Sequence, residues 1–187
     1  LNTCGNYNVA VGTSAMYTTS GNQNTAVGYL SLYKNTVSDN TAVGAYTLAC
    51  NTTGTYNTAV GYASQNYTNT GGGNTSLGRQ ALYLNNDGGA HNVAIGTFAM
   101  LDNTSGSCNV AVGTCALCDN TTGGNNVAVG WRSLYNNTTA GSNVAMGREA
   151  LVSNTTGAQN VAVGHTSLYT SITGDNNVGI GTCALYT

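Results

Sequence analysis

Few side chains in this sequence could catalyse a reaction or bind a metal. Two of the six cysteines, Cys115 and Cys118, form a C-x-x-C motif of the kind used in thiol–disulfide chemistry. The motif occupies ordinary positions of a repeat around Leu117, which weakens a redox interpretation. His91 and His165 are far apart, and neither is flanked by cysteines or carboxylates at metal-ligand spacing. We therefore expect no metal site.

The carboxylates and hydroxyls give no catalytic pattern either. Glu149 is the only glutamate, so a pair of glutamates for acid–base hydrolysis is absent. No serine stands in a G-x-S-x-G nucleophile elbow, and there is no glycine-rich phosphate loop. A net charge of −2, with only four Lys and Arg, leaves nothing to neutralise nucleic-acid phosphates. We expect a protein that is not an enzyme, needs no cofactor and binds no nucleic acid.

Asparagine is the polar residue with the most regular spacing. It stands four positions before each glycine that follows an aliphatic residue, in all eleven copies of a repeat. The column comprises Asn8, Asn24, Asn40, Asn57, Asn74, Asn92, Asn109, Asn126, Asn143, Asn160 and Asn177. A structural ladder is the favoured interpretation, with each amide bonding its neighbour or capping adjacent turn backbone. Repeated contact with a glycan or with ice is the alternative.

Tyrosine also recurs, five positions after the same glycine. It is found there at Tyr17, Tyr33, Tyr83, Tyr135, Tyr169 and Tyr186. Stacking of rings between neighbouring copies is the favoured interpretation, and an aromatic stripe that binds a glycan is the alternative.

The elements that position these residues follow from the repeat. Its glycines stand 16 to 18 residues apart, and the unit reads N-[VT]-A-[VIL]-G-x-x-[AST]-L-Y-x-N-T-T-G. Residues 126–130 alternate as a strand does, residues 133–135 suggest a second short strand, and residues 137–141 have turn chemistry. A unit this small buries a core only by stacking on its copies. The sequence predicts an all-β fold, a β-solenoid (β-roll or β-helix) of eleven coils of about 17 residues.

This solenoid is expected to form a single repeat domain over residues 1–187, with two short strands per coil and no separate caps. At a spacing of ~4.8 Å per coil, its length would be roughly 50 Å. The aliphatic residue before each glycine and the Leu four positions after it should face inward, joined in part by the Val or Thr after Asn. Gln65 replaces that Leu in one copy, and we expect a weak point or an outward-turned coil there.

Two further predictions concern disulfide bonds and the stacking of chains end to end. Cys108 and Cys118 could form a disulfide within one coil if its two strands face each other. The length of 187 equals eleven times 17, so copies could stack head to tail in register, with Cys4 and Cys183 at the junction. No apolar run is long enough for membrane insertion, and residues 1–5 lack the features of a signal peptide.

The unit resembles repeats in tail-fibre-like proteins of phages and large viruses and in related bacterial surface proteins. It is more loosely similar to the head repeat of trimeric autotransporter adhesins, with its S-V-A-I-G core. These resemblances imply an extracellular, cell-surface or virion-surface fibre, and a trimer packed through small residues such as Ala128 and Gly130. The sequence itself leaves trimerisation and receptor binding open.

These observations together predict a structural fibre component that self-assembles by end-to-end stacking, with copies of itself as partners. One alternative is an adhesin or tail-fibre shaft that binds a surface glycan. Another is an ice-binding solenoid, but Thr fills the Val/Thr position in only four of eleven copies, which counts against it.

Overall fold

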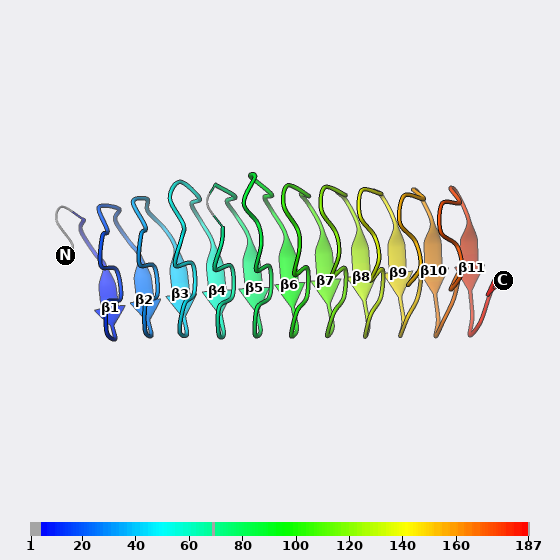
Figure 1. Ribbon diagram of the computed structural model, residues 1–187, viewed down its shortest axis with the longest axis horizontal. Coiled ribbons are helices and arrows are strands. Elements are labelled where there is room, and N and C mark those ends of the chain that lie inside the picture. The colour runs from blue at the N-terminus through cyan, green and yellow to red at the C-terminus, as the bar shows by residue number, and fades with distance from the viewer. Residues whose placement is uncertain (1–4, 69, 187) are drawn as a thin grey trace.

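The computed structural model describes residues 5–68 and 70–186, which form a straight stack of coils. Each coil contributes one three-residue strand to an 11-stranded parallel sheet whose strands follow sequence order (Figure 1). The strands are β1 Val9–Val11, β2 Thr25–Val27, β3 Thr41–Val43, β4 Thr58–Val60, β5 Thr75–Leu77, β6 Val93–Ile95, β7 Val110–Val112, β8 Val127–Val129, β9 Val144–Met146, β10 Val161–Val163 and β11 Val178–Ile180. The predicted all-β solenoid is confirmed.

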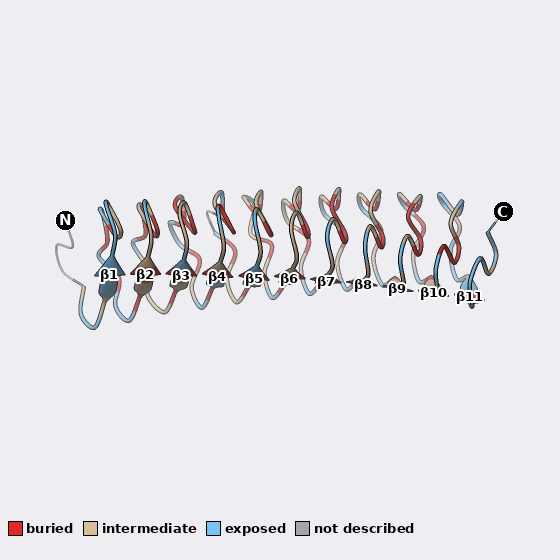
Figure 2. Ribbon diagram, turned by 90° about the horizontal axis from the view of Figure 1, so that it is seen from below, coloured by how far each residue is buried: buried red, intermediate tan, exposed pale blue. Residues whose placement is uncertain are grey.

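Neighbouring strands pair so that equivalent repeat positions lie side by side. Ala128 of β8 lies opposite Ala111 on one side and Ala145 on the other. The same register continues along the whole sheet, and the distribution of buried and exposed segments recurs from coil to coil (Figure 2). Each position therefore contacts its own copies, which explains why the same residue types recur at fixed offsets. In the described ranges no helix is long and apolar enough to cross a bilayer.

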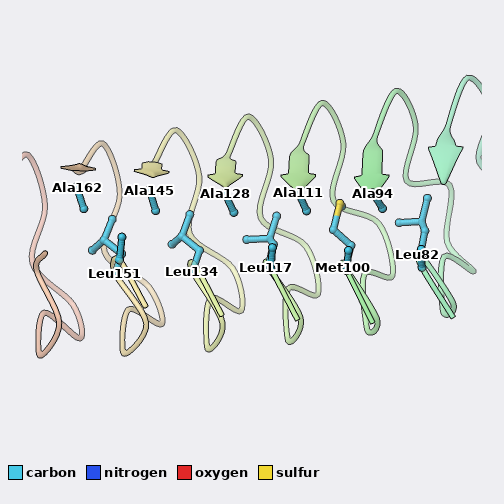
Figure 3. Close-up of a cluster of buried hydrophobic side chains, with 14 of the residues drawn as sticks. Leu82, Ala94, Met100, Ala111, Leu117, Ala128, Leu134, Ala145, Leu151 and Ala162 are labelled. Carbon is cyan, nitrogen blue, oxygen red and sulfur yellow. The ribbon is translucent and has the colours of Figure 1, made fainter. Parts of the chain in front are cut away.

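The buried face of the strands differs from the prediction. Ala128 is fully buried, whereas Val127 and Val129 on either side of it are partly exposed. Leu134 from the opposite wall fills the interior of the coil and is fully buried, as predicted. Figure 3 shows the strand alanines pointing toward these leucines across a narrow core. Only a small side chain fits opposite Leu, so Ala faces inward and the two aliphatic residues face outward.

The second predicted strand is not formed. The segment after Gly130 consists of turns in which Arg132 and Leu134 adopt left-handed φ angles of 54° and 51°. Its backbone still bonds to both neighbouring coils, because Arg132 N donates to Thr114 O at 3.1 Å and Leu134 N to Ala150 O at 3.0 Å. Hydrogen bonding between coils therefore offsets the cost of a conformation that L-residues rarely adopt.

The repeat glycine is required by its backbone and by its neighbours. Gly130 has a φ of 131°, and a Cβ added to it would lie 2.5 Å from the carbonyl oxygen of Gly147 in the next coil. Equivalent glycines stack along the rod with the same conformation. Any other residue here would be strained and would push adjacent coils apart.

Of the two alternatives predicted for Gln65, the outward-turned coil is wrong, and the weak point stays a prediction. Gln65 is fully buried, and its Nε2 donates to Ser76 Oγ at 2.8 Å and to Thr58 O at 3.2 Å. Ser76 occupies the position that Ala holds in the neighbouring strands, so a polar pair replaces the usual Leu–Ala pair. The apolar core is divided there, with one cluster from Met16 to Ala59 and another from Ala81 to Leu168.

Candidate functional site

The asparagine column lies inside the rod, where each side chain joins two coils. Asn126 is fully buried, and its backbone N–H donates to Oδ1 of Asn109 at 2.9 Å. Its own Oδ1 accepts from the backbone N–H of Asn143 at 3.0 Å, and its Nδ2 donates to Ala140 O at 2.9 Å. One amide therefore links its coil to the next and also fixes the turn of its own coil.

This pattern extends from Asn8 to Asn177, with a backbone-to-side-chain bond of 2.8 to 3.0 Å at every step. Only the two end members are partly exposed. A buried side chain whose donor and acceptor are already bonded cannot contact a glycan or ice. The geometry therefore favours the scaffold interpretation of the column over the ligand-binding one.

A second asparagine ladder runs parallel to the first, and the sequence interpretation missed it. Asn137 Nδ2 donates to Oδ1 of Asn120 at 2.9 Å and to Ala140 O at 3.0 Å. The column stands seven positions after the repeat glycine and comprises Asn35, Asn51, Asn85, Asn103, Asn120, Asn137 and Asn154. Thr68 interrupts it between Asn51 and Asn85. The fixed position of this asparagine in the repeat could reveal the column from the sequence alone, but the N-T-T-G segment that contains it is also typical of an ordinary turn.

The cysteines do not form the predicted links. Cys108 is an exposed free thiol and Cys118 is a buried one, so the disulfide between them is absent. The predicted facing strands do not exist, because the segment that carries Cys118 forms turns, and Cys118 takes the repeat position that Tyr135 holds in the next coil. Cys183 is exposed and free, and Cys4 lies outside the described residues, which leaves the junction hypothesis a prediction.

Cys115 and Cys118 lie close enough together for each thiol to affect the pKa of the other. Burial raises the pKa of Cys118 to about 12, and the nearby carboxylate of Asp119 adds to the shift. Burial is also the main cause of the raised pKa values of Cys115 and Asp119. A thiol with so high a pKa is protonated at neutral pH and is a poor nucleophile.

The tyrosine column stacks where adjacent coils both carry the ring. The ring centroids of Tyr17 and Tyr33 are 5.3 Å apart and nearly parallel, and those of Tyr169 and Tyr186 are 5.0 Å apart. Elsewhere the column finds other partners, such as the guanidinium of Arg132, which lies 4.5 Å from the centre of the ring of Tyr135. The ring of Tyr83 lies 5.2 Å from that of Tyr67 in the neighbouring coil, so ring contacts between coils account for five of the six rings.

The histidines stand on the surface and do not meet. His91 lines a shallow pocket of about 480 Å³ together with the exposed ring of Tyr56 and backbone of Gly72 and Gly73. His165 is exposed elsewhere on the rod. Within the described part of the chain, no group of three or more His, Cys, Asp or Glu side chains could hold a metal ion.

No protein-family model matches this chain, and neither a curated protein nor a solved structure matches it.

Proposed function

We propose that this chain is a structural rod, a segment of an extracellular or virion-surface fibre that supplies length and stiffness. The observation that carries the proposal is the continuous bonding along the stack, in which the sheet and the first asparagine ladder join all eleven coils. Among residues 5–68 and 70–186, by contrast, no group of three or more His, Cys, Asp or Glu side chains that could hold a metal ion comes together. A scaffold that repeats the same bonds from coil to coil fits a mechanical role.

We further propose that the rod lengthens by stacking copies end to end. Among the described strands, β1 and β11 each have only one neighbour, so each leaves one edge that can accept another coil. A second copy would offer the same register that pairs every strand inside the rod. The added coils would extend both the sheet and the asparagine ladder.

Electron microscopy of the purified chain tests this proposal. Rods should lengthen with protein concentration in steps of roughly 50 Å. Ala10→Lys should stop elongation, because Ala10 lies on the exposed outer coil where the next copy would dock. Thr13→Lys adds the same charge at an exposed position of the same coil and serves as the control. Particles of one fixed short length at all concentrations would contradict the proposal.

The proposed location outside the cell or on a virion rests on the resemblance of the repeat to fibre proteins. Antibodies raised against the rod should label intact cells or particles without permeabilisation. Labelling only after permeabilisation would contradict this location.

Glycan binding by the shaft is a second candidate function, favoured by the pocket beside Tyr56 and His91. An exposed tyrosine ring next to a shallow depression suits stacking against a sugar ring. A glycan array should then show binding that Tyr56→Ala abolishes, whereas Tyr7→Ala, which removes another exposed tyrosine, should leave it intact. Absence of binding by the unmodified rod would reject this candidate.

A further inference from the structure

The outer face of the sheet is an apolar surface that nothing in the described chain covers. Each strand presents its first and third side chains on this face, while the middle residue of β2 to β10 is buried in the core. The first column comprises Val9, Thr25, Thr41, Thr58, Thr75, Val93, Val110, Val127, Val144, Val161 and Val178. The second column comprises Val11, Val27, Val43, Val60, Leu77, Ile95, Val112, Val129, Met146, Val163 and Ile180. Neither column contains a buried side chain, and we call these two columns the outer valine face.

The outer valine face carries no charged residue from one end of the rod to the other. Large side chains are substantially exposed on it, including Leu77 at 49% and Met146 at 44%. The strands that carry it run nearly parallel to one another, so the face is long and regular (Figure 1). A continuous apolar strip of this kind on a soluble protein marks a surface that becomes covered.

The size of the face suits a protein interface. Three residues span about 10 Å along each strand, and ten spacings of ~4.8 Å give a length of about 48 Å. One copy would therefore cover roughly 500 Å², and a pair roughly 1,000 Å², which is about the minimum for a specific interface.

We propose that a second copy of this chain covers the outer valine face, so that two rods pair side by side. The two faces have the same coil spacing, and every strand of one rod can therefore meet a strand of the other. Sheets with β-branched outer residues pack face to face at about 10 Å, as in β-sandwiches. Absence of charge on both faces means that pairing leaves no ion buried without a partner.

This pairing is lateral and independent of end-to-end stacking. Stacking uses the edges of β1 and β11 and changes the length of the rod. Pairing uses the broad face and changes the mass per unit length. The trimer implied by the resemblance was expected to pack through Ala128, but Ala128 is buried inside its own coil and is not available.

Scanning transmission electron microscopy measures mass per unit length and separates the two modes. The unmodified rod should have the mass per length of two chains, whatever its length. Val112→Lys combined with Val129→Lys places two charges on neighbouring strands of the face and should halve that value. Thr122→Lys with Thr139→Lys is the matched control, with the same charge in the same two coils at exposed turn positions, and should stay paired.

A conservative variant keeps the test valid if the lysine pair fails to fold. Val112→Thr with Val129→Thr retains the shape and uses a residue that β2 to β5 already carry on this face. It should raise the dissociation constant of the pair by about tenfold, measured by analytical ultracentrifugation. A mass per length of one chain, or of three, in the unmodified rod would overturn the proposal. Single rods that produce thermal hysteresis would also overturn it and would assign the face to ice.

Discussion

Gln65 and Ser76 form a hydrogen-bonded polar pair in a core otherwise made of Leu, Met and Ala, although Oε1 of Gln65 has no hydrogen-bond partner. Gln65 Nε2 bonds to Ser76 Oγ, and that same oxygen lies 2.5 Å from Ser64 Oγ. A buried polar group costs less when it finds a partner, so the bonds made by Nε2 lower the cost of burying Gln65, whereas its unpaired Oε1 keeps part of that cost. The departures from the repeat at Gln65 and Ser76 are therefore coupled, because Ser76 accepts a hydrogen bond from Gln65.

Ser76→Ala alone should destabilise the rod by about 1–3 kcal/mol, because it removes the closer of the two acceptors of the buried Nε2 of Gln65. Gln65→Leu combined with Ser76→Ala restores the pair found in the other coils and should be at least as stable as the parent chain. Urea unfolding of both single variants and the double variant gives the coupling between the sites. Additive effects would show that the two residues act independently.

The thiols should differ in reactivity according to their burial. At pH 8, iodoacetamide should modify exposed Cys108 rapidly and Cys118 hardly at all, because the pKa of Cys118 is about 12. Mass spectrometry of the time course measures each rate. The raised pKa of Cys118 also makes the stability of the rod depend on pH. The protonated thiol contributes stability below the pKa of about 8.5 that it has in the unfolded chain, and that stability is lost as pH rises toward 12. Cys118→Ala should therefore flatten the alkaline fall in stability.

At the scale of the repeated element, the first asparagine ladder holds the strand and the following turn in place. Each amide supplies one acceptor to the next coil and one donor to its own turn. A substitution can separate the two roles, because an aspartate side chain keeps an acceptor oxygen for the next coil but has no N–H to donate to the turn.

Asn126→Ala should cost about 3 kcal/mol, since it leaves the N–H of Asn143 and the carbonyl of Ala140 buried without this partner. Asn126→Asp should cost at least as much at neutral pH, because a buried carboxylate would face the oxygen of Ala140. Thr139→Ala in the same coil is exposed and serves as the control. Thermal melts followed by circular dichroism measure the differences, and equal melting of all three variants would contradict a structural role for the ladder.

At the scale of the whole molecule, the rod has two apolar segments joined through a polar coil. The longer cluster runs from Ala81 to Leu168, and the shorter one ends at Ala59. Stacked repeats gain stability from their nearest neighbours, so a weak interface can open without unfolding the remainder.

Hydrogen exchange should therefore be slowest in β7 to β9, within the longer cluster, and faster in β4 and β5, on either side of Gln65. The Gln65→Leu, Ser76→Ala double variant should slow exchange in β4 and β5 and leave β7 to β9 unchanged. Uniform exchange along the rod would indicate a single cooperative unit instead.

The repeat alone determined the solenoid, the number of coils, the inward Leu column and the position of the first asparagine column, because each depends only on recurrence at a fixed offset. Three features required the tertiary structure. Alternation in Val127-Ala128-Val129 defines two faces, but only the narrow space opposite Leu134 decides that Ala points inward. Left-handed φ angles at Arg132 and Leu134 have no signature in residue type and arise from bonding to adjacent coils. Gln65 is polar in sequence and buried in the fold, because its partner Ser76 comes from the next coil.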